Sequence, residues 1–349
     1  MTSPSQKSLN KTDVGFFCSP IGLGHATRDI AIAQFFEGIS SKFVTGNGAA
    51  RIISEHGFDV TDAYTPPNFD VQDGALHGSL KWLWSYYQYY KDCKEVAQKF
   101  VKNEKPRLVV SDEDFASAVV AQQNNIPVVL ITDVLETNFT KGVGSIIEKK
   151  MNKSMKKIIQ KCDVVIMPEI GQDQGNIKRV GPIVRSTPHA RDELRSRFSF
   201  TKKTITVSVG GTGAGRFLIQ KTIEACSKLK EDFELVVVSG PTLKLDNSEN
   251  IRNLGFVNNL HEIIYASDLV VSLAGKSTID ESKAYGTPGI FIPIRNHFEQ
   301  EDNAKREGYS FQDIFRLEQL ISEKLESKRM PVHAEGAKKA SEIIAEYLQ

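Results

Sequence analysis

Short apolar, β-branched runs alternate with helical patterns along the chain, and this alternation constrains the fold more than any other feature. In the first half the short runs lie at Val14–Cys18, Ser41–Thr45, 107–111, 127–131 and 164–168. Helical patterns lie between them, for instance over 116–123. Strands that alternate with helices form βαβ units around a parallel sheet. The first half therefore predicts a doubly wound α/β domain.

The alternation stops near Gly181 and then starts again, which predicts a second domain. The new short runs lie at 204–209, 234–239, 253–257, 269–272 and 289–293. We expect an N-terminal domain at 1–183, a charged and irregular linker at 184–203, a second domain at 204–330, and a last helix at 331–349 that crosses back. Two Rossmann-like domains then face a cleft, and such sheets bind ligands beyond the carboxyl ends of their strands.

The composition excludes several classes of protein. Among 349 residues, 44 Lys and Arg balance 43 Asp and Glu, and this net charge of +1 argues against a protein that coats nucleic acid. No apolar stretch reaches the roughly 18 residues of a membrane-spanning helix. The polar first residues lack the apolar segment of a secretory signal. The four cysteines lie far apart, which argues against disulfides and a zinc site. We expect a cytoplasmic protein with no nucleic-acid partner.

Three glycine-containing turns invite a nucleotide-binding interpretation, and two of them lack part of a known signature. The turn at 22–27 has Thr27 where a dinucleotide-binding turn has its third glycine. The turn at 275–278 has Val270 where the Walker A motif has its first glycine. The turn at 210–215 is either a tight strand-to-helix turn or a set of backbone amides that faces an anion. NAD, FAD and P-loop chemistry are therefore disfavoured.

The block over 253–304 carries the most specific chemistry. Small residues at 274–278 lead into a helix, whose free N–H groups and dipole form a site for a diphosphate. Glu281 follows Ser277 by four residues and Thr278 by three, so the three share a helix face. A carboxylate there can accept both hydroxyls of a ribose. Glu299 and Gln300 follow a strand and can read sugar hydroxyls.

This block resembles the donor-binding segment of GT-B nucleotide-sugar glycosyltransferases. The resemblance is strongest to glycosyltransferase family 28, the family of the UDP-N-acetylglucosamine transferase that completes lipid II, and weaker to the UDP-glycosyltransferases. Its motif residues are Gly275, Ser277, Thr278, Glu281, Glu299, Gln300, Asn303 and Ala304. The turns at 22–25 and 210–215 resemble the family's other glycine-rich loops. The resemblance covers nearly the whole chain and implies the GT-B fold, a UDP-sugar as co-substrate and no metal.

The resemblance also implies roles for the donor-side residues. Phe256 and Val257 border the base, Ser277 and Thr278 the diphosphate, Glu281 the ribose, and Glu299 with Gln300 the sugar. Lys276 either neutralises phosphate charge or is a solvated turn lysine. The candidate donor-binding residues are Gly211, Thr212, Gly213, Phe256, Val257, Gly275, Lys276, Ser277, Thr278, Glu281, Glu299, Gln300 and Asn303.

Glycosyl transfer with inversion requires an acceptor hydroxyl that loses its proton as it attacks. His25 is the candidate base, because it lies at the carboxyl end of the first strand in a Gly-x-Gly-His turn. A carboxylate that holds its tautomer makes a histidine a better base. Asp112 occupies the place where some relatives carry that acid, and Asp114 is the alternative. Both aspartates are equally compatible with capping the next helix.

Two features of the first domain point to the acceptor. Residues 82–90 hold six aromatic side chains, more than one core-facing stripe needs, and amphipathic aromatics suit a bilayer interface or an acceptor groove. Residues 148–161 form a basic amphipathic pattern, which suits anionic lipid or a helix with a solvated lysine face. The candidate acceptor-facing or membrane-facing residues are Gly24, Trp82, Trp84, Tyr86, Lys153 and Lys157.

We therefore expect an inverting glycosyltransferase that moves a sugar, of the GlcNAc type or a hexose, from a UDP-sugar to a hydroxyl of a lipid or lipid-linked acceptor. Such a protein would work as a peripheral protein on the cytosolic face of a membrane. Two other functions stay open at this point. One is a UDP-GlcNAc 2-epimerase-like enzyme, and the other is a non-catalytic module that binds a nucleotide-sugar.

Overall fold

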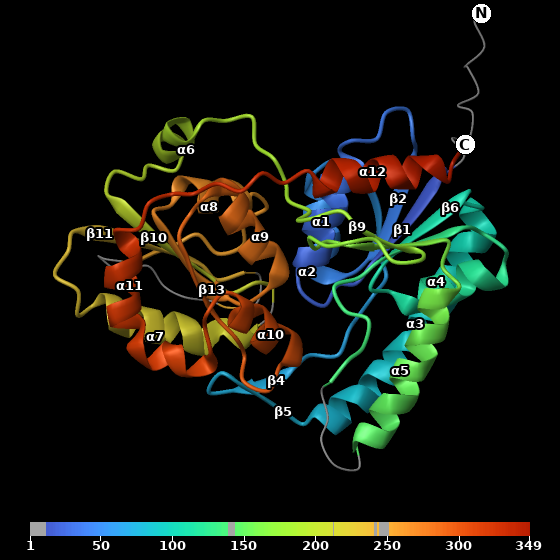
Figure 1. Ribbon diagram of the computed structural model, residues 1–349, viewed down its shortest axis with the longest axis horizontal. Helices are drawn as coiled ribbons and strands as arrows, with labels where there is room; N and C mark the ends of the chain where they lie inside the picture. Colours follow the sequence, from blue (N-terminus) through green and yellow to red (C-terminus); the bar gives the residue numbers. More distant parts are fainter. Residues whose placement is uncertain (1–11, 139–143, 212, 241–242, 244–250) are drawn as a thin grey trace, which may run out of the picture.

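The chain folds into two parallel β-sheets, each covered by helices, with the first sheet and the second sheet facing one another across the molecule (Figure 1). The computed structural model describes residues 12–138, 144–211, 213–240, 243 and 251–349. A two-stranded hairpin, β4 (Asp70–Gln72) and β5 (Ala75–His77), leaves the first domain and bonds to the second, where the Leu76 amide donates to the Arg295 carbonyl at 2.8 Å.

The first sheet has seven parallel strands in the order β3-β2-β1-β6-β7-β8-β9. The strands are β1 (Val14–Cys18), β2 (Ser41–Thr45), β3 (Asp59–Asp62), β6 (Leu108–Asp112), β7 (Val128–Ile131), β8 (Val164–Met167) and β9 (Ile177–Arg179). Neighbouring side chains of β1 point to opposite faces: Phe16 packs with Ile30, and Phe17 packs with Phe100. Because both faces of the inner strands β1, β7 and β8 are buried, these strands are continuous apolar runs in the sequence.

Five helices of the first half cover this sheet: α1 (Gly24–Ala33), α2 (Asn47–Glu55), α3 (Ser79–Glu104), α4 (Phe115–Gln123) and α5 (Gly144–Gln160). Helices α1 and α2 cover one face, and α3, α4 and α5 cover the other. The 26-residue helix α3 is amphipathic. Within the part of the chain that the structure describes, no helix is long and apolar enough to cross a bilayer.

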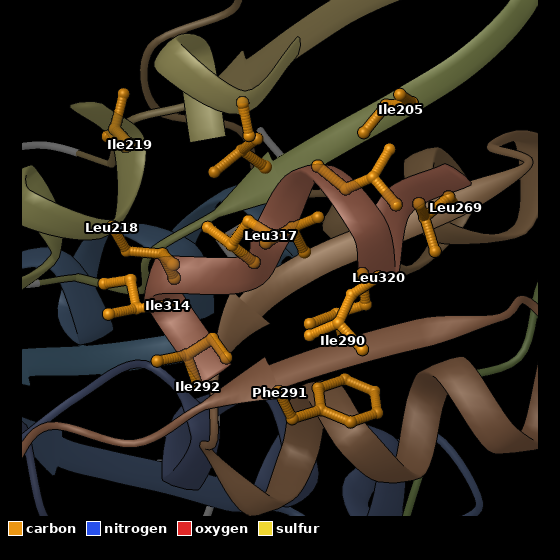
Figure 2. Close-up of a cluster of buried hydrophobic side chains, with 14 of the residues drawn as sticks. Ile205, Leu218, Ile219, Leu269, Ile290, Phe291, Ile292, Ile314, Leu317 and Leu320 are labelled. Atoms are coloured by element: carbon orange, nitrogen blue, oxygen red, sulfur yellow. The ribbon is translucent and has the colours of Figure 1, made fainter. Parts of the chain in front are cut away.

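The second sheet has five parallel strands in the order β12-β11-β10-β13-β14. The strands are β10 (Lys203–Ser208), β11 (Phe233–Val238), β12 (Ile251–Asn253), β13 (Leu269–Leu273) and β14 (Gly289–Ile292). The helices are α6 (Arg191–Arg197), α7 (Arg216–Cys226), α8 (Leu260–Ala266), α9 (Lys276–Tyr285), α10 (Phe298–Arg306) and α11 (Leu317–Leu325). Figure 2 shows the main core of this domain, in which Leu317 and Leu320 of α11 lie near Ile290 and Ile292 of β14.

The segment predicted as an irregular linker contains helix α6. Its Leu194 is fully buried in the core of the second domain with Val236 of β11. The charged residues of this segment suggested an irregular linker. In the structure, two of them, Arg191 and Arg195, form ion pairs with Asp268 and so hold α6 against the second domain. The chain then returns to the first domain, where α12 (Gly336–Glu346) packs in the same core as α1.

Candidate active site

A cavity of about 840 Å³ lies between the carboxyl ends of the two sheets. Its walls come from the loops that follow β1, β6 and β7 in the first domain and β10, β13 and β14 in the second. Parallel α/β sheets bind their ligands at this edge. The predicted site residues that line it are Gly24, His25, Trp82, Trp84, Tyr86, Gly211, Phe256, Val257, Gly275, Lys276, Ser277, Thr278, Glu281, Glu299 and Gln300.

The other predicted residues do not line this cavity, and Thr212 lies outside the described residues. Asn303 was predicted to bind the donor, but its amide nitrogen donates to the Ala274 carbonyl at 3.2 Å and so supports the turn that leads into α9. Gly213 begins a short 3₁₀ turn that leads into α7. Lys153 and Lys157 lie on the exposed face of α5.

His25 and Asp112 form the centre of the site. His25 lies in the first turn of α1, and Asp112 is the last residue of the neighbouring strand β6. The His25 Nδ1–H donates to Asp112 Oδ1 at 2.9 Å, so Nε2 remains for the cavity. Asp114 instead caps α4 and accepts a hydrogen bond from the Tyr64 hydroxyl at 2.6 Å. Of the two candidate aspartates, Asp112 is therefore the one that pairs with His25.

Arg28 and Asp133 complete this centre, and the sequence analysis missed both. The Arg28 guanidinium donates from Nε to Asp112 Oδ2 at 2.5 Å and from Nη1 to Asp133 Oδ2 at 2.7 Å. Arg28 follows His25 by three residues on α1, and this helical spacing was a usable signal. Asp133 follows β7 by two residues, and only its place after a strand marks it.

The charges around His25 determine its protonation. Burial lowers the pKa of His25, but the charge of Asp112 and the hydrogen bond to it outweigh burial, and together with Glu113 they raise the pKa to about 9. Asp112 is fully buried, yet Arg28 and His25 hold the pKa of its carboxyl well below its usual value. Without substrate, His25 is therefore an imidazolium at neutral pH.

The second domain presents a helix N-terminus to the same space. Ser277 and Thr278 lie in the first turn of α9, directly after Gly275. A Cβ at Gly24 would lie 2.7 Å from Ser277 Oγ, so the absence of a side chain at Gly24 lets the two domains touch. Lys276 forms an ion pair with Asp280 one turn later and is only 20% exposed, which holds its ammonium group beside the turn.

Glu281 is held by a residue that no sequence motif marked. Arg185, from the segment between the sheets, donates from Nε and Nη2 to Glu281 Oε1 at 3.0 and 2.9 Å. Both side chains are almost fully buried, and Arg185 also donates to the Asn258 carbonyl at 2.7 Å. Because Arg185 uses Oε1, Oε2 is the oxygen of Glu281 that can bind a ligand.

Glu299 and Gln300 form the wall of the cavity that the first turn of α10 provides. Burial, together with the charges of Glu113 and Asp133 across the cleft, raises the pKa of Glu299 to about 8. This raised pKa favours the protonated carboxyl group, which can donate as well as accept a hydrogen bond. Gln300 Oε1 accepts a hydrogen bond from the Ile294 amide at 3.0 Å. The side-chain NH₂ group of Gln300 is therefore the part that can donate to a ligand.

Phe256 lies where the two domains meet. The Arg51 guanidinium of α2 lies over its ring at 4.3 Å from the centroid, and the ring packs against the core that contains α1. Val257 packs against the second domain, in the core that contains Leu194 and Val236. Gly211 adds a second close approach, because a Cβ there would lie 2.7 Å from Leu23.

The cavity has an apolar arm that runs between α3 and α5. Trp82 stacks between Phe69 and Tyr86, with ring centroids 4.8 and 5.1 Å apart. At the outer end, Trp84 is 68% exposed and Ile147 of α5 is 53% exposed. Both residues line the cavity together with Met151 and Met155. The surplus aromatic face of α3 thus forms one wall of a groove that begins beside His25 and opens at the surface.

Comparison with known proteins agrees with this geometry. Residues 204–344 match the glycosyltransferase family 28 C-terminal domain. An uncharacterized glycosyltransferase of Methanopyrus kandleri is 26% identical, over 93% of this chain and 99% of that protein. The UDP-N-acetylglucosamine–N-acetylmuramyl-(pentapeptide) pyrophosphoryl-undecaprenol N-acetylglucosamine transferase of Leuconostoc citreum is 29% identical, over 59% of this chain and 58% of its own length.

Among solved structures, the glycotransferase of kitacinnamycin has a TM-score of 0.66 at 13% identity, covering 97% of this chain and 99% of that one. The two facing sheets therefore form the GT-B fold, as the sequence predicted. With the match of residues 204–344 and the similar glycosyltransferases, the chain is a glycosyltransferase whose second domain is similar to the family 28 C-terminal domain.

Proposed function

We propose that this chain is an inverting glycosyltransferase that moves a sugar of the GlcNAc type or a hexose from a UDP-sugar to a hydroxyl of a lipid or lipid-linked acceptor. The observation that carries the proposal is the continuity of one cavity. It joins an anion-binding helix N-terminus, an ion-paired histidine and an apolar groove that opens at the surface.

The donor lies against the second domain in this proposal. The amides at the start of α9, with Ser277 and Thr278, bind the diphosphate, and Lys276 adds positive charge. Glu281 Oε2 binds the ribose hydroxyls, while Glu299 and Gln300 bind the sugar. The amides, the two hydroxyls and the Lys276 ammonium group stabilise the negative charge that develops on the departing UDP, and we propose no metal for this role.

The acceptor lies against the first domain. The apolar arm between α3 and α5 accommodates a hydrocarbon chain and brings its polar end to His25. The acceptor then approaches from the first domain while UDP leaves toward the second, and this opposed arrangement inverts the configuration at the sugar carbon. Exposed apolar residues at the mouth, Trp84, Ile146 and Ile147, and the lysines of α5 favour a site at the cytosolic surface of a membrane.

Release of UDP tests this proposal. The purified chain is incubated with UDP-GlcNAc, UDP-glucose or UDP-galactose and a total lipid extract, and released UDP is measured. The matched controls are an aqueous extract and the corresponding dTDP-sugars. We expect release with one UDP-sugar that depends on the lipid fraction. Release with the aqueous extract alone contradicts the lipid acceptor, and no release with any UDP-sugar contradicts the donor assignment.

A further inference from the structure

Glu113 lines the cavity in a backbone conformation that side chains other than Asn and Asp seldom adopt. Its φ is +50°, in the left-handed region. Among the non-glycine residues with positive φ in the described ranges, Glu113 is the one that lines this cavity. Such strain costs about 1–3 kcal/mol and concentrates at functional sites. The turn that Glu113 makes between β6 and α4 directs its side chain toward His25.

The carboxyl group of Glu113 is fixed at one oxygen and open at the other. Oε1 accepts hydrogen bonds from the Asp133 amide at 2.9 Å and from the Thr132 hydroxyl at 3.2 Å. Oε2 lies 3.8 Å from His25 Nε2, and the Glu113 side chain is 20% exposed. His25 therefore has a carboxylate on each side: Asp112 at Nδ1 and Glu113 near Nε2.

The 3.8 Å gap between His25 Nε2 and Glu113 Oε2 is too long for a hydrogen bond, but it suits a ligand atom between them. One hydroxyl oxygen can lie about 2.8 Å from both atoms, which is the usual hydrogen-bond length. We propose that Glu113 is a further catalytic residue: the acceptor hydroxyl lies between these two atoms and passes its proton to Glu113 Oε2, while His25 donates to the same oxygen. This inference rests on the proposed transfer to a hydroxyl.

The protonation of the two groups supports this division of roles. An imidazolium has no free lone pair, so a doubly protonated His25 donates hydrogen bonds and cannot take a proton. A bound UDP-sugar adds negative charge and favours the imidazolium further. Burial raises the pKa of Glu113, and the positive charge of His25 opposes this increase. The titratable and charged groups facing Glu113 and His25 are Arg28, Tyr86, Asp112, Asp133 and Glu299.

The step balances without a further reactant. The acceptor O–H bond breaks, and its proton moves to Glu113 Oε2. The acceptor oxygen forms a bond to the anomeric carbon of the sugar. The bond from that carbon to the diphosphate oxygen breaks, and its electron pair leaves with UDP. Glu113 then releases the proton to solvent after the product departs.

Three variants at Glu113 test the proposal, with E136Q as the matched control because Glu136 is an exposed carboxylate in the neighbouring loop. We expect E113Q to lower kcat for UDP release at least about 100-fold, the usual range for general base catalysis. We expect E113D to retain part of the activity, and UDP affinity to change less than twofold. E113G keeps a residue that adopts this positive φ readily but removes the carboxyl group, so it should lose activity to the same extent as E113Q.

The pH profile separates Glu113 from His25 as the proton acceptor. If Glu113 takes the proton, kcat/KM rises as Glu113 ionises and falls as His25 loses its proton near pH 9. A rate that rises through pH 9, or E113Q activity within threefold of E136Q, overturns the proposal. Histidine NMR covers the case in which no UDP-sugar is turned over. E113Q should lower the pKa of His25, and an unchanged value also overturns the proposal.

Discussion

The two domains face the same cavity with different chemical groups. The first domain presents charged side chains that hold one another in place, with Arg28 between Asp112 and Asp133 and His25 bonded to Asp112. The second presents mainly the N-terminus of α9, whose free groups are backbone amides, and two ion pairs, Arg185–Glu281 and Lys276–Asp280. Each face suits a different task, because proton transfer needs a titratable side chain whereas backbone amides suffice to bind an anion.

This difference predicts how substitutions on the two sides separate. Loss of a side chain in the first domain should lower turnover with little change in UDP affinity. Loss of a side chain in the second should weaken donor binding or destabilise the domain, because its side chains support the turn more than they react. A substitution that moves turnover and UDP affinity together, on either side, would break the comparison.

The largest effect is expected for His25→Ala. The variant removes the group that we propose donates a hydrogen bond to the acceptor oxygen, while Asp112 keeps its partner Arg28. We expect kcat to fall about a thousandfold, at the upper end of the usual cost of removing a hydrogen-bond donor from the reacting atoms. UDP affinity, measured by calorimetry, should change less than twofold. His77→Ala is the control, because His77 is exposed and does not line the cavity. A large loss of UDP affinity in His25→Ala would place the donor against the first domain.

The next effect concerns stability in the second domain. Arg185→Met leaves Glu281 as a buried carboxylate without its cation, and removal of one partner of a buried pair costs about 3 kcal/mol or more. Urea unfolding should detect this loss, and UDP affinity should also fall. Adding Glu281→Gln to Arg185→Met should restore part of the stability but not the affinity. The control Lys178→Met breaks an exposed pair and should cost less than about 1 kcal/mol. Equal losses in the two single variants would contradict a buried role for Arg185.

The same two faces show what the sequence could and could not predict. The second face follows from a local motif, since Gly275, Ser277, Thr278 and Glu281 lie within seven positions on one turn and helix. Spacing along a helix is readable without a structure. All four of these residues line the cavity, and the alternation of strands and helices likewise predicted both sheets.

The first face depends on contacts between distant segments. His25, Asp112 and Asp133 meet because β1, β6 and β7 are neighbours in the sheet, and strand order is a long-range property. Glu113 was not predicted from the sequence. Its position in the site follows from a positive φ, and nothing about a glutamate in a sequence indicates that backbone conformation. Arg185 lies in the segment predicted as a charged and irregular linker, although its side chain is almost fully buried.

The smallest effect tests whether the two faces touch as closely in solution as they do here. A Cβ at Gly24 would lie 2.7 Å from Ser277 Oγ, whereas a Cβ at Gly275 meets no atom within 4 Å. Gly24→Ala should therefore lower kcat/KM about tenfold by pushing the faces apart, which is about 1.4 kcal/mol. Its Tm should not fall, because Gly24 lies in α1 and alanine favours a helix. An unchanged kcat/KM in Gly24→Ala would mean that catalysis does not require this contact.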